Sequence, residues 1–516
     1  MLTRRLEDVA LVLDSPKDQV AIAKEDIPAD SKLVCGEGII EMDSAIRKGQ
    51  RFALWDIAGG ELVRQYGYPF GRSRGIAKGE LVTADNVESV LPGADPSNFV
   101  EPNPTPYSPE YTGKTFLGYV RRTGTVGTRN YYLIVPTSMC ASETAMQIAC
   151  RLDNLEEVPG SFANIDGVIA VPHTEGCGCV ANEQIDRVLR VLKGFVLHSN
   201  VGGCLIVDLG CEQTNYGKVY PYLKSAVEAC GKPVDWITIQ DCGGTRKTLE
   251  RACSIVVARL PEVNKARRMR CPIEHLVVGT ECGASDSFSG ITPNPIIGNA
   301  VDKVIFGRGS AILSEVPEMV GTFAMLLPRF RNMEVAQDFL GIVQWYEALA
   351  RRLGLSLEDN LVPKNREGGL INNFIKSLGA VMKGGTTVIE DVVDYGEPLR
   401  GKGLTVMQGP GGDLESVTGL TASGATIICF STGKGTTTGS AICPVIKVAS
   451  TDELAGSLPE DIDFNAGRLL IEKVPMDALG EELFEMILRV ASGEKTWSEK
   501  WKQRQFQIWT AGKLSV

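Results

Sequence analysis

Apolar and polar residues alternate with a period of two in several short segments near the amino terminus. Residues 19–23, 51–57 and 62–68 follow this pattern, and glycine and aspartate residues separate them. Such alternation, with turn residues between the runs, predicts short β-strands. We therefore expect residues 1–95 to form a small all-β domain. This segment contains no histidine and no metal-binding spacing.

Prolines are concentrated in the segment that follows, at positions 92, 96, 102, 104, 106 and 109. Proline at this density resists regular secondary structure and favours an extended, semi-rigid chain. We therefore expect a linker over residues 96–114, with a domain boundary on its amino-terminal side.

Longer apolar runs alternate with helix-type periodicity from about residue 115 onward. The runs typical of buried strands are residues 131–136, 167–172, 204–209, 236–240, 276–279, 311–313, 405–407, 426–430 and 445–448. Apolar residues recur with a helical period in residues 142–155, 182–197, 245–260, 333–353 and 479–501. This alternation predicts an α/β fold with mostly parallel sheets and helices on their faces. We expect an α/β catalytic domain over residues 115–395 and a glycine-rich α/β domain over residues 396–516.

The composition narrows the class of protein. Hydrophobic residues make up 43% of the chain, charged residues 22%, and the formal net charge is −10. The chain has no basic stripe of the kind that binds nucleic acid. No run reaches the roughly 18 apolar residues of a membrane helix, and charges interrupt the first apolar run, which is atypical of a signal peptide. We expect a cytoplasmic protein with no nucleic-acid or membrane partner, and the sequence leaves open whether it forms a homo-oligomer.

Polar and sulfur-containing side chains follow five of the predicted strands. These segments are His173–Cys179, Asp208–Glu212, Gln240–Thr245, Thr280–Asp286 and Ser314–Glu315. In open parallel sheets, ligands bind beyond the carboxyl ends of the strands. We therefore expect the five strand ends to form one site along a single edge.

The chemistry of these side chains favours a divalent metal. Imidazole and thiolate groups suit iron, zinc or copper, whereas carboxylates alone would indicate magnesium or calcium. The predicted metal ligands are His173, Cys177, Cys211 and Cys282. A single cysteine at any one of these positions is also typical of a packed thiol, so the prediction depends on their occurring together.

Two glycine-rich segments are candidates for binding an anionic substrate. Arg129 and Asn130 end the segment Thr123–Asn130, and Lys434 and Thr436 lie within Gly433–Gly439. Backbone N–H groups in such turns can form an anion nest, and a lysine or arginine adds charge. Ser285 and Asp286 complete the predicted substrate-binding residues. Neither a phosphate loop of the Walker type nor a dinucleotide fingerprint is present.

Several ordered motifs resemble those of the altronate/galactarate dehydratases, over nearly the whole chain. The motifs are Gly124–Asn130, His173–Gly178, Gly210–Glu212, Gly243–Thr245, Glu281–Pro295, Gly368–Leu370, Ala422–Gly424, Thr432–Gly439 and Asp463–Gly467. The resemblance implies a small β-clip domain of the SAF type at the amino terminus. One departure is Ala284, which stands where the family usually has glycine, so the resemblance leaves the substrate open.

The resemblance also implies an activity. The expected reaction is elimination of water from a sugar acid to give a 2-keto-3-deoxy acid, with Fe²⁺, or else Mn²⁺, as cofactor. The proton-abstracting base is predicted among His173, Glu212, Asp241 and Glu281, and Arg129 and Lys434 are the predicted partners of substrate carboxylates.

Three other interpretations remain. Related sulfo-lyases act on sulfolactate, so the leaving group could differ from water. An iron–sulfur cluster held by Cys177, Cys211 and Cys282 is a second enzymatic alternative. A sugar-acid-binding protein without catalytic activity is the alternative from a different class, and binding without product formation would favour it.

Overall fold

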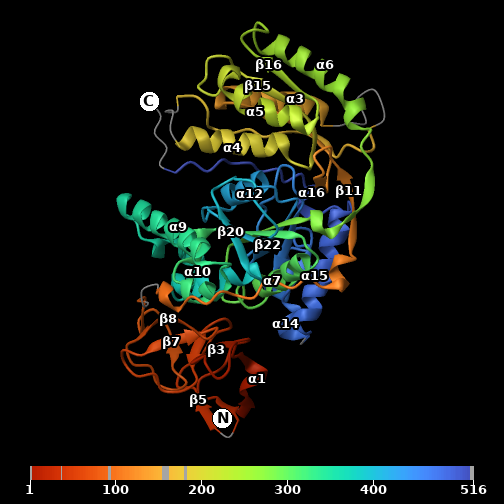
Figure 1. Cartoon of the computed structure of the whole chain (residues 1–516). Helices are drawn as coiled ribbons and strands as arrows, with labels where there is room; N and C mark the ends of the chain where they lie inside the picture. The colour runs from red at the N-terminus through yellow and green to blue at the C-terminus, as the bar shows by residue number, and fades with distance from the viewer. Residues whose placement is uncertain are drawn as a thin grey trace.

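The computed structural model describes residues 3–36, 38–90, 95–153, 162–178, 183–472 and 474–511. Three parts follow one another in space (Figure 1). The amino-terminal strands lie at one end, a seven-stranded sheet with its helices forms the centre, and a four-stranded sheet with its helices lies at the opposite end. Cysteine 179, at the end of one motif noted above, lies outside the described residues.

The amino-terminal part is all-β apart from one short helix, α1 (Leu6–Val9), as predicted. Its three sheets are β1-β4-β5, β10-β8-β7 and β2-β3-β6-β9. The strands are β1 (Thr3–Arg5), β2 (Ala10–Leu11), β3 (Val20–Ala23), β4 (Lys32–Cys35), β5 (Gly38–Glu41), β6 (Arg51–Ala53), β7 (Leu62–Gln65), β8 (Tyr68–Ser73), β9 (Leu81–Val82) and β10 (Val87–Glu88). The strand predicted over residues 51–57 ends at Ala53, where the chain turns.

The proline-rich segment lies along the central part of the molecule. It contains only two short helical turns, η1 (Pro96–Asn98) and α2 (Pro109–Thr112). The amide of Ser108 donates to the carbonyl of Phe306 at 3.0 Å, and the Thr105 hydroxyl accepts from the amide of Val388 at 3.0 Å. Hydrogen bonds to the main chain therefore fix the path of this linker.

The four-stranded sheet is parallel and has the order β14-β13-β15-β16. Its strands are β13 (Tyr131–Pro136), β14 (Gly167–Ala170), β15 (Val201–Asp208) and β16 (Val234–Thr238). Helices α3 (Met139–Leu152) and α6 (Thr245–Val263) share one hydrophobic core with one face of this sheet. Helices α4 (Glu183–Leu197) and α5 (Tyr216–Cys230) cover the other face. Beside it, β11 (Thr115–Val120), β12 (Val126–Gly127) and β17 (Arg268–Pro272) form a small antiparallel sheet.

The seven-stranded sheet is also parallel, with the order β20-β21-β19-β18-β22-β23-β24. Its strands are β18 (Val277–Gly283), β19 (Ser310–Leu313), β20 (Ile389–Val393), β21 (Gly403–Met407), β22 (Ile427–Thr432), β23 (Val445–Ala449) and β24 (Phe464–Asn465). The boundary expected at residue 395 does not separate two sheets, because β18 pairs directly with β22 from beyond it. The buried strands pair across about 150 residues of sequence, which local patterns do not reveal.

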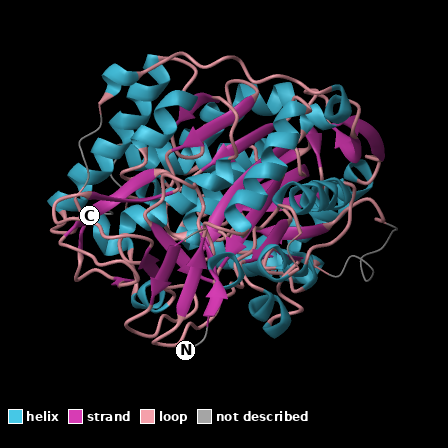
Figure 2. Cartoon of the chain, turned by 90° about the horizontal axis from the view of Figure 1, so that it is seen from below, coloured by secondary structure: helices cyan, strands magenta, loops and turns pink. Residues whose placement is uncertain are grey.

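Helices lie on both faces of this large sheet (Figure 2). They are α7 (Pro293–Phe306), α8 (Phe323–Leu326), α9 (Met333–Arg352), α10 (Pro363–Glu367), α11 (Asn373–Ala380), α12 (Asp413–Ala422), α13 (Asp452–Ser457), α14 (Arg468–Ile471), α15 (Met476–Ala491) and α16 (Trp497–Lys500). The helices predicted over residues 333–353 and 479–501 correspond to α9 and to α15 with α16. Short 3₁₀ turns are η2 (Ile273–His275), η3 (Val316–Met319), η4 (Leu327–Arg329), η5 (Leu357–Asn360) and η6 (Val381–Gly384). None of the described helices has the length and apolar character needed to cross a membrane.

Candidate active site and metal centre

Three buried potential metal ligands meet at the carboxyl edge of the seven-stranded sheet. Cys282 is the last residue but one of β18, Glu315 follows β19, and Glu318 lies in the η3 turn. One ligand atom from each of the three lies within 4.8 Å of the others. The Cys282 sulfur is 3.2 Å from the nearer carboxylate oxygen of Glu318. These strands are neighbours in the sheet, so their ends converge as expected for a parallel fold.

Two lysines neutralise part of the negative charge in this cluster. Lys383, at the η6 turn, lies 2.9 Å from the Cys282 sulfur and forms an ion pair with Glu315. Lys376, on α11, forms an ion pair with Glu318 at 2.7 Å. All of these side chains are buried, so the charges act on one another in a medium of low dielectric constant.

The surroundings shift the acidity of each group. Burial raises the pKa of Glu315 to about 7, although Lys383 opposes this shift. Burial also acts on Glu318, but the neighbouring Lys376 and Lys383 outweigh it and lower the pKa of that carboxyl. Burial acts against the charged form of Lys383, yet the acidic groups around it raise its pKa well above the usual value. The Lys383 ammonium therefore occupies the cluster as a cation.

A second acidic pair lies beside this cluster. Glu281 accepts a hydrogen bond from the Ser416 hydroxyl at 2.5 Å through one oxygen, and its other carboxylate oxygen is buried without a partner. Burial and the nearby Glu315 raise the pKa of Glu281 well above its usual value. Burial, with Glu318, raises the pKa of Asp413 to about 6. These surroundings therefore favour the neutral form of the Glu281 carboxyl group.

Two residues at this edge adopt left-handed backbone conformations. Ala284 has a φ of 52° and Glu315 has a φ of 70°. Positive φ costs a non-glycine residue free energy and is concentrated at functional sites. The conformation at Ala284 explains why glycine suits this position, and the one at Glu315 turns its side chain toward Cys282.

The amino-terminal domain reaches the same region. Arg51, at the start of β6, is buried and donates to the Ser287 hydroxyl at 3.0 Å and to the Gly369 carbonyl at 2.7 Å. A third hydrogen bond, of 2.7 Å, joins it to the side-chain oxygen of Gln65. No carboxylate of the described residues forms an ion pair with Arg51, and burial lowers its pKa to about 10. A buried guanidinium without a counter-charge is costly unless a ligand supplies one.

Arg51 lines a narrow polar cavity between the two domains, together with Tyr66, Asp286 and Lys376. Tyr66 enters it from the two-residue turn Tyr66–Gly67, where both residues have positive φ, as such hairpin turns require. Residues of the amino-terminal domain therefore line the same cavity as Lys376, the lysine that pairs with Glu318.

Several buried polar atoms on chain segments that contribute to this cavity have no hydrogen-bond partner among the described residues. They are the side-chain nitrogen of Gln65, both polar side-chain atoms of Asn373 and the Ser377 hydroxyl. Asn373, Lys376 and Ser377 are spaced three and four residues apart on α11, so they share one face of that helix. Buried polar groups are normally paired, and the cavity, with a volume of about 10 Å³, has room for a single water molecule.

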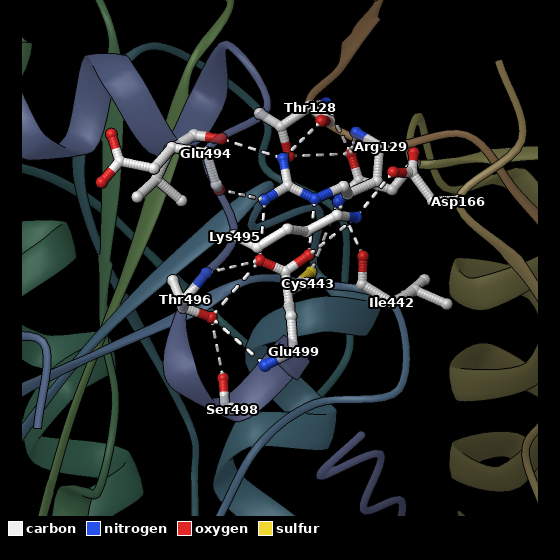
Figure 3. Close-up of polar contacts among 12 residues, drawn as sticks. Thr128, Arg129, Asp166, Ile442, Cys443, Glu494, Lys495, Thr496, Ser498 and Glu499 are labelled. Atoms are coloured by element: carbon white, nitrogen blue, oxygen red, sulfur yellow. Dashed lines mark hydrogen bonds and ion pairs between the residues drawn. The ribbon is translucent and has the colours of Figure 1, made fainter. Parts of the chain in front are cut away.

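Arg129 lies elsewhere and is fully engaged within the protein (Figure 3). It forms a bidentate ion pair with Glu499, at 2.6 and 2.7 Å, and donates to the carbonyls of Thr128, Val490 and Glu494. It is 0% exposed. Asn130 is also buried, and its side chain donates to the carbonyl of Asn164 at 2.6 Å. Both residues therefore connect the segment before β13 to other parts of the chain. All N–H donors of Arg129 are used within the protein, so none is left for a substrate.

The other predicted substrate-binding residues lie nearer to the cluster. Asp286 lines the polar cavity, but it accepts hydrogen bonds from the amides of Phe288 and Ser289 and from the Ser450 hydroxyl. Ser285 lines the same cavity. Burial raises the pKa of Asp286, and the exposed Lys434 opposes this shift only in part. Thr436 is half-buried and bonds within its own loop, to Thr438 at 3.1 Å.

The single site edge predicted from the sequence is divided between two sheets. Glu281 and Cys282 belong to the seven-stranded sheet, whereas His173, Cys177, Cys211, Glu212 and Asp241 follow strands of the four-stranded sheet. The prediction that all five strand ends form one site is therefore wrong, because only strands of the same sheet share an edge. The four predicted metal ligands, and the alternative cluster of three cysteines that included Cys282, are divided in the same way.

His173 and Glu212 are occupied by hydrogen bonds to their surroundings. One ring nitrogen of His173 accepts from the amide of Glu175 at 3.1 Å, and the other lies 2.9 Å from the carbonyl of Pro136. The Glu212 carboxylate accepts from the amides of Leu209 and Gly210, and hydroxyl groups from a neighbouring loop also donate to it. Asp241 is exposed in the turn that follows the edge strand β16. These three residues do not meet the Cys282 cluster.

Sequence reasoning missed Glu318, Lys376, Lys383 and Arg51. None of them stands at the end of a predicted strand, and only Lys383 adjoins a pair of glycines, Gly384 and Gly385. Only the spacing of these residues gave a weak indication of the site. Glu318 follows Glu315 by three residues, and Lys376 and Lys383 are seven residues apart, which corresponds to about two helical turns.

Three family models match consecutive parts of the chain. They are the altronate/galactarate dehydratase SAF domain at residues 9–90, the D-galactarate dehydratase/altronate hydrolase second domain at residues 118–264, and the D-galactarate/altronate dehydratase C-terminal domain at residues 273–514. The second and third matches correspond to the four-stranded and the seven-stranded sheets.

Curated relatives match nearly the whole length. An altronate dehydratase of Bacillus subtilis is 32% identical over 96% of this chain and 98% of its own length. A galactarate dehydratase (L-threo-forming) of Escherichia coli is 33% identical over 94% of this chain and 93% of its own. A (2R)-sulfolactate sulfo-lyase subunit beta of Chromohalobacter salexigens is 30% identical over 77% of this chain and 98% of its own. The chain therefore belongs to the altronate/galactarate dehydratase family.

Proposed function

We propose that this chain is a metal-dependent dehydratase that eliminates water from an aldonate or aldarate and forms a 2-keto-3-deoxy acid. The observation that carries the proposal is the buried cluster of Cys282, Glu315 and Glu318 with two lysines. The relatives named as altronate and galactarate dehydratases support the substrate class.

A divalent metal fits the cluster. One thiol and two carboxylates, all buried and within 4.8 Å of one another, form a donor set of mixed softness, which suits Fe²⁺ or Mn²⁺ better than magnesium. Cys282, Glu315 and Glu318 would hold the ion, which would supply positive charge for the substrate carboxylate and for the negative charge that develops beside it. Fe²⁺ is the proposed metal.

Lys383 is the proposed base. It is buried next to Cys282 and Glu315. The negative groups around Lys383 hold it protonated in the metal-free chain, and a metal bound by these ligands would offset their charge and so favour loss of the lysine proton. As a neutral amine, Lys383 removes the proton from the carbon next to the substrate carboxylate. A base acting on such a carbon creates the enediolate from which elimination proceeds.

Glu281 is the proposed acid. Its pKa is raised well above the usual value by burial and by Glu315, so it carries a proton that it can give to the departing hydroxyl group. The carbon–oxygen bond breaks, the hydroxyl leaves as water, and the resulting enol tautomerises to the 2-keto-3-deoxy acid. The proton lost to Lys383 and the proton given by Glu281 balance.

Arg51 is the proposed partner of a substrate carboxylate in place of Arg129. It is buried, forms no ion pair with a carboxylate of the described residues, and lines the cavity with Lys376. The amino-terminal domain thus completes the substrate site.

A sulfo-lyase is the second candidate, because one relative carries that name. Both reactions begin with loss of the same kind of proton and differ in the leaving group. Anaerobic incubation with Fe²⁺ and a panel of aldonates, aldarates and sulfolactate distinguishes them. A 2-keto-3-deoxy product from a sugar acid supports the dehydratase, sulfite release from sulfolactate alone favours the second candidate, and binding without any product would contradict both.

A further inference from the structure

A large cavity lies where the part of the chain with the four-stranded sheet meets the part with the seven-stranded sheet. Its volume is about 580 Å³, within the range of roughly 300–1,000 Å³ that is typical of sites for small organic ligands. One wall is formed by α4, α5 and the turn between β11 and β12. The other wall is formed by the amino ends of β18, β19 and β22 and by the segments before β21 and after α12. Figure 1 shows α4 facing the central part of the molecule across this boundary.

The cavity is separate from the Cys282 cluster. Val277 lines the cavity and is the first residue of β18, whereas Cys282 lies five residues further along the same strand. At about 3.3 Å per residue, the two residues are about 17 Å apart, toward opposite edges of the sheet. A molecule bound in the cavity is therefore not the substrate held at the cluster.

Direct contacts hold the two walls of the cavity together. A Cβ atom at Gly194, on α4, would lie 2.4 Å from the carbonyl oxygen of Ala422, the last residue of α12. One ring nitrogen of the buried His198 lies 3.0 Å from the carbonyl oxygen of Ala425. The side-chain nitrogen of Asn200 donates to the carbonyl of Ile442 at 2.9 Å. The cavity is therefore fully formed in the structure and needs no movement of the two parts to open it.

The charge of the cavity lining is positive. Its charged residues are Arg190, Lys193 and Lys402, and no aspartate or glutamate is among the described residues that line it. Arg190 already has a carboxylate partner, Asp394, at 2.6 Å. The ammonium group of Lys193 lies 4.8 Å from the centre of the Tyr222 ring, and that of Lys402 donates to a main-chain carbonyl of the η2 turn. In the described part of the chain neither lysine forms an ion pair with a carboxylate, so both retain positive charge that an anion can neutralise.

Two further cations lie behind the wall segment formed by His198 and Ser199. Lys232 donates to the His198 carbonyl at 2.5 Å, and Arg121 donates to the Ser199 carbonyl at 2.7 Å. No carboxylate of the described ranges forms an ion pair with either side chain. Burial lowers the pKa of Lys232 to about 7, and Arg121 adds to this shift. Buried positive charge without a counter-charge costs free energy, and an anion in the cavity would reduce that cost.

One face of α4 presents both charge and apolar surface to the cavity. The residues of this face that line it are Arg190, Lys193, Gly194 and Leu197. They are spaced three and four residues apart, so they share one side of the helix. Further apolar residues of the lining are Val126, Val277, Pro398 and Leu399. The cavity therefore suits a molecule in which an acidic group is joined to an apolar body.

Two glycines from the sequence motifs leave space at the cavity. Gly124 and Gly424 both line it and have φ values of 83° and 108°. A Cβ atom at either position would meet no atom within 4 Å. Gly124 belongs to Thr123–Asn130, one of the two segments that the sequence predicts to bind an anion. The first four residues of that segment, and not Arg129, line this cavity.

We propose that this cavity binds a small organic anion. The acidic group of the ligand pairs with Lys193 on α4, and its apolar part packs against Leu197 and Val277. Lys402 adds to the positive charge that favours the anion. The site is independent of the Cys282 cluster and of the dehydration proposed there.

Fluorescence titration of the full chain with 8-anilinonaphthalene-1-sulfonate tests this proposal, because this dye joins one sulfonate group to an apolar ring system. The expected result is one strong site per chain. N-phenyl-1-naphthylamine has the same rings without the sulfonate, so it should bind this site at least about 10-fold more weakly, since it lacks the charged contact.

Substitutions at the cavity separate the charge from the space. Lys193→Met removes the charge and should weaken dye binding at least about 10-fold, and Lys193→Arg should restore part of the affinity. Gly401→Phe should also weaken binding, because Gly401 lines the cavity and a Cβ atom there meets nothing within 4 Å. Lys224→Met, at an exposed lysine of α5 outside the lining, is the matched control. Cys282→Ala should bind the dye like the wild type, whether or not the proposed metal site is correct.

Labelling of the wild-type chain covers the case in which a variant fails to fold. Saturating dye should slow the acetylation of Lys193 by acetic anhydride, measured by mass spectrometry, while Lys224 reacts at an unchanged rate. Absence of a strong dye site, equal labelling of Lys193 with and without dye, wild-type affinity in Lys193→Met, or equally tight binding of the neutral dye would each overturn the proposal.

Discussion

The ammonium group of Lys383 lies 2.9 Å from the sulfur of Cys282, and both side chains are buried. Lys383 also forms an ion pair with Glu315, so it balances part of the negative charge of Cys282 and Glu315, two of the residues that would hold a metal. The same contact gives Lys383 a position next to any substrate held at these ligands.

Lys383 should be needed for turnover and much less for binding. Replacement by methionine removes the base, so kcat should fall by roughly 10²- to 10⁴-fold, while KM changes little. The measurement is steady-state kinetics with the acid identified in the substrate panel. Lys364→Met, at an exposed lysine on α10, should keep wild-type kinetics, and equal kcat values for the two variants would refute the role of Lys383.

Arg51 should determine substrate affinity. Loss of a charged hydrogen bond to a carboxylate costs about 1.5–3 kcal/mol, so Arg51→Met should raise KM by roughly 10- to 100-fold. Arg51→Lys should restore part of the affinity, because it retains the charge. Arg47→Met, at an exposed position of the same domain, is the matched control. An unchanged KM in Arg51→Met would remove the amino-terminal domain from the substrate site.

Arg129 should act on stability and not on substrate binding. It forms a buried bidentate ion pair with Glu499, and breaking such a pair leaves an uncompensated charge that costs about 3–5 kcal/mol. Denaturant unfolding of Arg129→Met should show a loss of this size, with KM unchanged at a temperature where the variant is folded. A raised KM without loss of stability would favour the substrate contact expected from the sequence.

Lys232 should make stability depend on pH. Burial lowers the pKa of this lysine to about 7, below its unfolded value near 10.5. The unfolded chain therefore binds more protons between these values, and the free energy of unfolding rises with pH across that window, by at most about 1.4 kcal/mol per pH unit. Unfolding measured from pH 7 to pH 9 should show this rise in the wild type and a smaller one in Lys232→Met. Identical slopes would contradict it.

Local patterns were sufficient to predict much of the fold. The buried strands such as β13 and β22 are continuous apolar runs, and helices such as α9 repeat apolar positions with a helical period. Patterns of this kind depend only on neighbours along the chain. They do not specify which strands pair: Val278 lies beside Ile427 in the sheet, and nothing near either residue in sequence indicates this.

The same limit explains what was predicted of the site. Cys282 and Glu281 stand at the end of an apolar strand, where the rule for parallel sheets places ligands. Arg51 lies in the amino-terminal domain and Lys376 lies on helix α11. Only tertiary packing brings the two side chains to one cavity. From the sequence alone, such a charged residue is predicted to be exposed, because its burial depends on tertiary packing.

The central claim is that Cys282 and Glu318 hold the metal on which dehydration depends. The direct measurement is the rate of 2-keto-3-deoxy acid formation by wild type, Cys282→Ala and Glu318→Gln, each titrated anaerobically with Fe²⁺. Cys150→Ala is the control with an exposed cysteine. Loss of both high-affinity Fe²⁺ binding and product formation in the two site variants, with a wild-type result for the control, is the predicted result. Wild-type rates in both site variants, with the chains folded, would contradict it.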